Sequence, residues 1–91
     1  TSTLDPFVEI ETTASPNPFG QSLTIQFQSN GGHNRISLHD ALGHEVSTLG
    51  NQKYPSGSVL IRFDGGRLSS GNYFYRIIGE GRSVTRSLVK I

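Results

Sequence analysis

Apolar and polar residues alternate along much of this chain, with the period of two that is typical of a strand with one buried face. The clearest example is the segment from Gln21 to Gln28, in which Leu23, Ile25 and Phe27 fall on one side and polar residues on the other. The same pattern predicts further strands at residues 7–12, 33–40, 45–48, 58–64, 72–78 and 82–91.

Glycine-rich turns separate these segments at intervals of about 8–12 residues, the spacing of an all-β sandwich or barrel. Examples are Asn30-Gly31-Gly32, Asp64-Gly65-Gly66 and Gly79-Glu80-Gly81. A helical period is nearly absent, because Gly43 interrupts the only stretch that resembles one. Short connections favour antiparallel neighbours. We therefore predict an all-β chain of seven strands, mostly antiparallel, packed as an immunoglobulin-like β-sandwich.

Two local features refine this prediction. Tyr73 begins a strand just after a corner that contains Gly71, where its hydroxyl can bond a nearby backbone group as in a tyrosine corner. In the last strand, Val84 and Leu88 share one parity, but Arg86 lies between them and interrupts the apolar pattern. Val89 and Ile91 have the other parity. A β-bulge or a change of partner sheet near Arg86 would reconcile the two parities.

Composition limits what the chain can be. Its 91 residues suffice for one domain with a modest core. The net charge is +1 and the arginines are dispersed, so no nucleic-acid surface is expected. Cysteine is absent, which excludes a disulfide framework. No apolar run approaches the roughly 20 residues of a spanning helix. The first residues lack the basic and apolar regions of a signal peptide. We interpret the chain as a piece of a longer polypeptide.

Candidate chemistry is sparse. Two groups of side chains could be imagined to hold a metal: His33, His39 and His44, and Asp40, Asp64 and Glu80. The histidine spacing matches no common zinc pattern, and carboxylates in glycine-rich turns more often bond the local backbone. No serine lies in a Gly-x-Ser-x-Gly motif, and no glycine-rich loop precedes a helix. We expect no catalytic residue, no metal and no cofactor.

The predicted surface offers two weaker alternatives. Arg62 and Arg76 are interpreted as solvated sheet surface on one face, with anion binding as the alternative. Tyr54 and Phe74 are the only aromatic residues expected to be exposed, which is little for a carbohydrate-binding surface.

Four motifs follow one another between Ala14 and Ile91. They are "SPNPFGQSLTIQF", "ISLHDALGHEV", "LSSGNYFYRI" and "SLVKI". In this order they resemble the C-terminal sorting domain of the type IX secretion system, type A. The residues that match its motifs, with the last residue of the chain, are Pro16, Asn17, Pro18, Phe19, Asp40, Gly43, Val46, Leu68, Gly71, Tyr73, Lys90 and Ile91.

This resemblance implies a non-catalytic recognition tag of immunoglobulin-like fold. It would direct a secreted cargo protein through the type IX translocon across the outer membrane to the bacterial cell surface, where a sortase removes the tag. Residues 1–13 would be the linker or the end of the cargo, with an edge strand at 7–12, and residues 14–91 the sorting domain. The implied partners are the translocon, the sortase and the preceding cargo, with no nucleic acid and no membrane insertion; the oligomeric state is not indicated. Lys90 and Ile91 are expected at an exposed end.

Two other functions remain open at this point. A flagellar hook-capping immunoglobulin-like domain is the nearest alternative, because "FDGGRLSSGNYFY" resembles it as well. Phe63 stands where that family typically has Trp, which favours sorting. The second alternative is a carbohydrate-binding or spacer module of a secreted glycosidase, since sandwiches host many functions.

Overall fold

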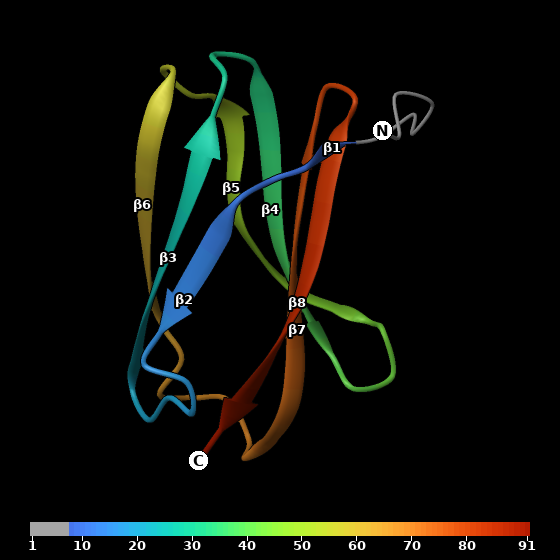
Figure 1. Cartoon of the computed structure of the whole chain (residues 1–91). Coiled ribbons are helices and arrows are strands. Elements are labelled where there is room, and N and C mark those ends of the chain that lie inside the picture. Colours follow the sequence, from blue (N-terminus) through green and yellow to red (C-terminus); the bar gives the residue numbers. More distant parts are fainter. Residues whose placement is uncertain (1–7) are drawn as a thin grey trace.

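The alternating segments form strands in the computed structural model, which describes residues 8–91. The strands are β1 (Val8–Glu9), β2 (Thr12–Ser15), β3 (Ser22–Ser29), β4 (His33–Asp40), β5 (Glu45–Lys53), β6 (Gly57–Asp64), β7 (Gly71–Gly79) and β8 (Arg82–Lys90). One sheet has the order β1-β8-β7-β4-β5 and the other β2-β3-β6. Figure 1 shows the two sheets packed against each other. The all-β sandwich is confirmed, and its immunoglobulin-like assignment stays a prediction.

The core lies between the sheets and is filled by one face of each long strand. Leu23, Ile25 and Phe27 of β3 are fully buried, as the alternation predicted. The other buried apolar residues are Ile10, Phe19, Ile36, Leu38, Tyr73, Tyr75, Ile77, Val84 and Leu88. Tyr54 is partly buried and packs edge-on against Phe27, with ring centroids 5.5 Å apart. Large apolar side chains alternating on two facing sheets are therefore what holds this sandwich together.

Strand pairing is mostly antiparallel, as predicted. The pairs β2–β3, β3–β6, β4–β5, β4–β7 and β7–β8 are antiparallel. The short β1 instead runs parallel to β8, with Val8 opposite Arg82 and Glu9 opposite Ser83. β1 thereby covers one end of the β8 edge, which would otherwise present unpaired backbone groups.

The single strand predicted at residues 7–12 is wrong. Phe7 lies outside the described residues, and β1 and β2 belong to different sheets. Between them Ile10 is fully buried, and its N–H donates to the carbonyl oxygen of Ser83 at 3.4 Å. The chain thus crosses from one sheet to the other, as the blue segment in Figure 1 shows. Residues 8–91 consequently form eight strands rather than seven.

β5 extends beyond the strand predicted at residues 45–48. The prediction ended too early because bulges interrupt the alternation of apolar and polar residues. Gly50 and Thr48 pair with successive residues of β4, so Leu49 is an extra residue at that point. Leu49 packs against the core, and the strand continues to Lys53. A second register shift lies nearer the start of β5. Bulges of this kind bend and twist an edge strand and so protect it from pairing with other chains.

The bulge predicted near Arg86 is also wrong. β8 pairs with β7 in one continuous register along its whole length. Arg86 has the same parity as the buried Val84 and Leu88, but its Nη1 lies 3.0 Å from Glu9 Oε2 in an exposed ion pair. A long side chain can carry its charge out from a core-facing position at a sheet edge. The strand therefore needs no irregularity to accommodate this arginine.

Tyr73 forms the predicted corner, since its hydroxyl donates to the carbonyl oxygen of Ser69 at 2.8 Å. Tyr73→Phe keeps the buried ring but removes this hydrogen bond, so we expect the free energy of unfolding to fall by about 1 kcal/mol. Urea denaturation measures the change. Tyr54→Phe is the matched control, because among residues 8–91 the Tyr54 hydroxyl has no hydrogen-bond partner within the usual distance limits. Equal midpoints for Tyr73→Phe and the parent chain would contradict the corner.

Candidate recognition surface

The segment Pro16–Gly20, called the proline turn below, joins β2 to β3. The Ser15–Pro16 and Asn17–Pro18 peptide bonds are both cis. Pro16, Asn17 and Pro18 are exposed, whereas Phe19 is fully buried. Figure 1 shows this turn at the same end of the sandwich as the end of β8.

The proline turn binds the outer edge of β8 through Asn17 and Phe19. The Val89 N–H donates to Asn17 Oδ1 at 3.0 Å, and Asn17 Nδ2 donates to the Ser87 carbonyl oxygen at 3.4 Å. Next along the edge, the Phe19 N–H donates to the Val89 carbonyl oxygen at 2.9 Å, and the Ile91 N–H donates to that of Phe19 at 3.0 Å. The Asn17 amide therefore imitates a strand neighbour and supplies partners that an open edge would lack.

The Phe19 ring packs against a second turn, at Asp64–Gly66. A Cβ atom added at Gly65 would lie only 2.7 Å from Cε2 of this ring, so glycine is needed for the close approach. The Gly65 N–H also donates to the Gln21 carbonyl oxygen at 2.7 Å. The sequence marked these glycines only as a turn signal, and their role under the proline turn was not predicted.

Lys90 is buried, contrary to the predicted exposed end. Lys90 is only 8% exposed and forms a parallel β-bridge with Phe19. Its Nζ donates a hydrogen bond to the Ile91 carbonyl oxygen at 2.8 Å. Ile91 remains 66% exposed, as predicted. The reason is that the proline turn folds over the end of β8. Deleting these two residues would therefore remove partners of the proline turn, and not only an exposed tail.

A hollow of about 590 Å³ lies beside this contact. Its lining residues are Gly20, Gln21, Asp64, Gly66, Arg67, Lys90 and Ile91. Asp64 Oδ1 accepts a hydrogen bond from the Gly66 N–H at 3.0 Å, so this carboxylate serves its own turn. Arg67 is exposed at the rim.

Asp40 and Gly43 shape the tip of the β4–β5 hairpin. Asp40 Oδ1 accepts hydrogen bonds from the Leu42 N–H at 3.0 Å and the His44 N–H at 2.9 Å. Gly43 has a φ of 91°, which favours glycine over residues with a side chain. Both residues thus fix the backbone of the turn, and Leu42 is displayed at its tip, 82% exposed. Val46 of the same motif is exposed in β5.

The four sequence motifs meet at one end of the sandwich. Asp40 lies opposite Tyr73 in the β4–β7 pair, and Gly71 lies opposite Lys90 in the β7–β8 pair. Lys90 in turn bridges to Phe19, as described above. Leu68, from the corner before β7, is partly buried and packs against the core near Gly65. We call this region the motif end; it consists of the proline turn, the Asp40–Gly43 turn, the corner Leu68–Tyr73 and the end of β8 at Lys90 and Ile91. It joins segments that are distant in the sequence.

Other candidate groups do not assemble into sites. Within residues 8–91, no three histidine, aspartate or glutamate side chains lie close enough together to hold a metal ion. The single arginine-lined face is wrong: Arg62 pairs with Thr24 in the three-stranded sheet, whereas Arg76 pairs with Ser37 in the five-stranded sheet. The two arginines point from different sheets and cannot share a surface.

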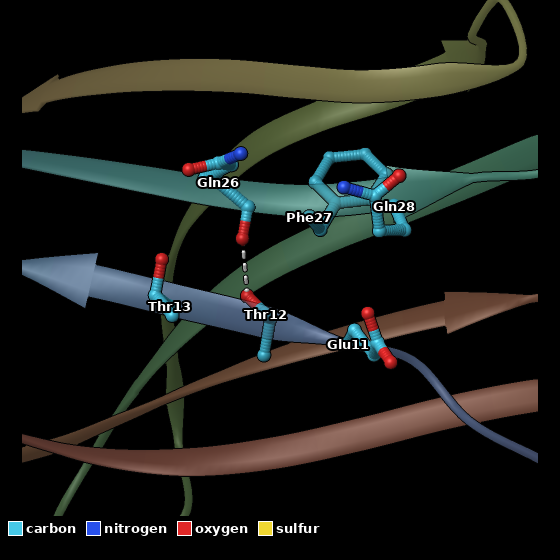
Figure 2. A pocket seen from close by; sticks show the side chains of 6 residues that line it. All are labelled: Glu11, Thr12, Thr13, Gln26, Phe27 and Gln28. Atoms are coloured by element: carbon cyan, nitrogen blue, oxygen red, sulfur yellow. Dashed lines mark hydrogen bonds between the residues drawn. The ribbon is translucent and has the colours of Figure 1, made fainter.

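A further hollow, of about 200 Å³, lies where the crossing segment enters β2. Figure 2 shows the side chains that line it. It is lined by Glu11, Thr12, Thr13, Gln26, Phe27 and Gln28. Thr12 Oγ1 donates to the Gln26 carbonyl oxygen at 2.7 Å, and the Gln28 N–H donates to the Glu11 carbonyl oxygen at 3.1 Å. Both hydrogen bonds join this segment to β3, and Glu11 is the only titratable residue among those that line the hollow. We interpret this hollow as a surface depression at the point where β2 begins to pair with β3, and not as a binding site.

Comparison with known proteins adds one match. A family model described as a secretion system C-terminal sorting domain matches residues 13–91 and so spans all four motifs. No curated protein matches the chain at the similarity that we required. In the part of the chain that the structure describes, no helix has the length and apolar character needed to cross a membrane.

Proposed function

Because the chain belongs to the family of type IX secretion C-terminal sorting domains, we propose that the export machinery recognises the motif end of the sandwich. Membership implies a tail of a cargo protein that is exported across the outer membrane. Signal domains of this family are generally non-catalytic. The proposed role of this surface is therefore to be bound by the export machinery, and not to catalyse a reaction.

The observation that carries this proposal is the binding of the proline turn to the β8 edge. Pro16, Asn17 and Pro18 are exposed, and the hydrogen bonds of Asn17 and Phe19 hold this turn against the end of β8. A rigid surface loses little conformational entropy when a partner binds it. In this proposal the proline turn and the end of β8 contact the translocon, while Asp40, Gly43, Leu68, Gly71 and Tyr73 act by shaping the same end.

We further propose that residues 14–91 are the sorting domain and that a surface sortase detaches it from its cargo. The segment 8–13 then packs onto the domain as β1, the crossing and part of β2. Burial of Ile10 and the Glu9–Arg86 ion pair disfavour cleavage at these two residues, since cleavage needs an accessible chain.

A reporter fusion tests the function. A periplasm-targeted reporter followed by residues 1–91 is expressed in a host with an intact type IX system and in the same host without the translocon. We expect the reporter at the cell surface or in the medium of the first host and in the periplasm of the second. Periplasmic retention in both hosts would count against a sorting function.

A further inference from the structure

A small hollow lies on the outer face of the five-stranded sheet, on the side away from the core. It measures about 220 Å³ and is lined by His39, Gly43, Phe74, Arg76 and Thr85. The sheet register explains how these residues meet. Phe74 of β7 lies opposite His39 of β4, and Arg76 lies opposite Thr85 of β8. The hollow is therefore built on three adjacent strands, which hold its side chains more firmly than a loop would.

Arg76 supplies a positive charge that is not neutralised on this face. Among residues 8–91, Arg76 has no carboxylate within salt-bridge distance. The neighbouring Arg35 differs, because its Nη2 lies 2.6 Å from Glu45 Oε2. The hydrogen bond from Arg35 lowers the pKa of Glu45, so this carboxylate is charged and already engaged. An anion that entered the hollow would meet Arg76 as a cation that no carboxylate engages.

His39 forms a fixed wall of the hollow. Its Nδ1 lies 3.3 Å from the Gly43 carbonyl oxygen, and its Nε2 lies 2.8 Å from Ser37 Oγ. A carbonyl oxygen can only accept, so Nδ1 is the donor. In the neutral ring Nε2 then accepts from the Ser37 hydroxyl. Both nitrogens are occupied, which holds the imidazole in place and leaves Arg76 and Thr85 as the polar groups free to bind a ligand.

We propose that this hollow binds a sugar unit that carries a carboxylate. The Arg76 guanidinium matches a carboxylate in charge and can bind it through two parallel hydrogen bonds. The Thr85 hydroxyl can bond a ring hydroxyl, and Phe74 offers an apolar surface to the C–H face of the ring. At about 220 Å³ the hollow is smaller than the roughly 300–1,000 Å³ of pockets for drug-sized ligands, which suits one sugar unit. This inference does not depend on the sorting function.

Titration of the full 91-residue chain with glucuronic acid, followed by amide NMR shifts, tests the proposal. We expect saturable shifts at Phe74, Arg76 and Thr85. Glucose has the ring without the carboxylate, and propionate has the carboxylate without the ring, so each should bind at least about tenfold more weakly. Absence of saturable shifts overturns the site, and equal binding of glucose or propionate overturns the assigned chemistry. Tighter binding of a glutamate-rich peptide would assign the hollow to a protein partner and also overturn it.

Two arginine variants distinguish binding in this hollow from attraction of the anion by the net charge of the protein. Arg76→Gln should weaken glucuronate binding by at least about tenfold, because it removes the only free cation of the hollow. Arg62→Gln makes the same change on the outer face of the other sheet and should leave the affinity unchanged. The dispersion of each NMR spectrum shows whether the variant is folded. Equal losses in the two variants would mean that net charge, and not this hollow, attracts the anion.

Discussion

Phe19→Ala should lower the free energy of unfolding by about 3–5 kcal/mol, the range for truncating a buried phenylalanine. The ring is fully buried, and it fills the space between the proline turn and Gly65. Its removal leaves a cavity that these turns cannot close without breaking their hydrogen bonds to Val89 and Gln21. A domain of this size is stable by only about 5–15 kcal/mol, so the variant would lose a large part of its stability.

Urea denaturation followed by circular dichroism measures this loss. Leu42→Ala is the control, because Leu42 is 82% exposed at the tip of the β4–β5 hairpin. An exposed substitution of this kind should change stability by no more than about 0.5 kcal/mol. If both variants unfold at the same urea concentration as the parent chain, Phe19 does not anchor the proline turn.

Ile10→Ala should lower the free energy of unfolding by about 2–5 kcal/mol. Ile10 is fully buried where the chain crosses between the sheets, and its N–H bonds to Ser83 at the β8 edge. A residue in a linker that does not pack on the domain would contribute almost nothing to the free energy of unfolding. The substitution therefore measures whether the packed unit includes the segment before Ala14.

The matched control is the same change at an exposed position. Ile78→Ala lies on the outer face of β7, where the isoleucine is 43% exposed and contributes less buried area. We expect a shift in the urea midpoint well below that of Ile10→Ala. Comparable shifts for the two variants, or no shift for Ile10→Ala, would show that the crossing segment is not part of the core.

Much of the fold could be predicted because strand alternation follows directly from burying one face. Leu23 and Ile25 of β3, and Tyr75 and Ile77 of β7, lie in the core where the pattern placed them. The same rule failed where a side chain does not follow its parity. Arg86 faces the core side but extends to solvent, so the pattern wrongly suggested a bulge there.

The motif end could be predicted only in part. The roles of Asp40 and Gly43 are local, because their hydrogen bonds and φ angle lie within one turn, and such turns leave a sequence signature. The contact between Asn17 and the β8 edge joins segments from the two ends of the domain. No local pattern encodes which distant strand a turn will cover, so the burial of Lys90 could not be foreseen either.

We propose that export depends on the proline turn held against β8. Export of the reporter fusion carrying Asn17→Ala tests it most directly, because this change frees the Ser87 and Val89 edge groups while keeping both prolines. Ile77→Val, toward the end of β7 that is remote from the motif end, is the control; it should lower the free energy of unfolding by about 0.5–1.5 kcal/mol. We predict that the Asn17→Ala fusion stays in the periplasm while the Ile77→Val fusion reaches the surface. Normal export of the Asn17→Ala fusion, or equal retention of both, would contradict the claim.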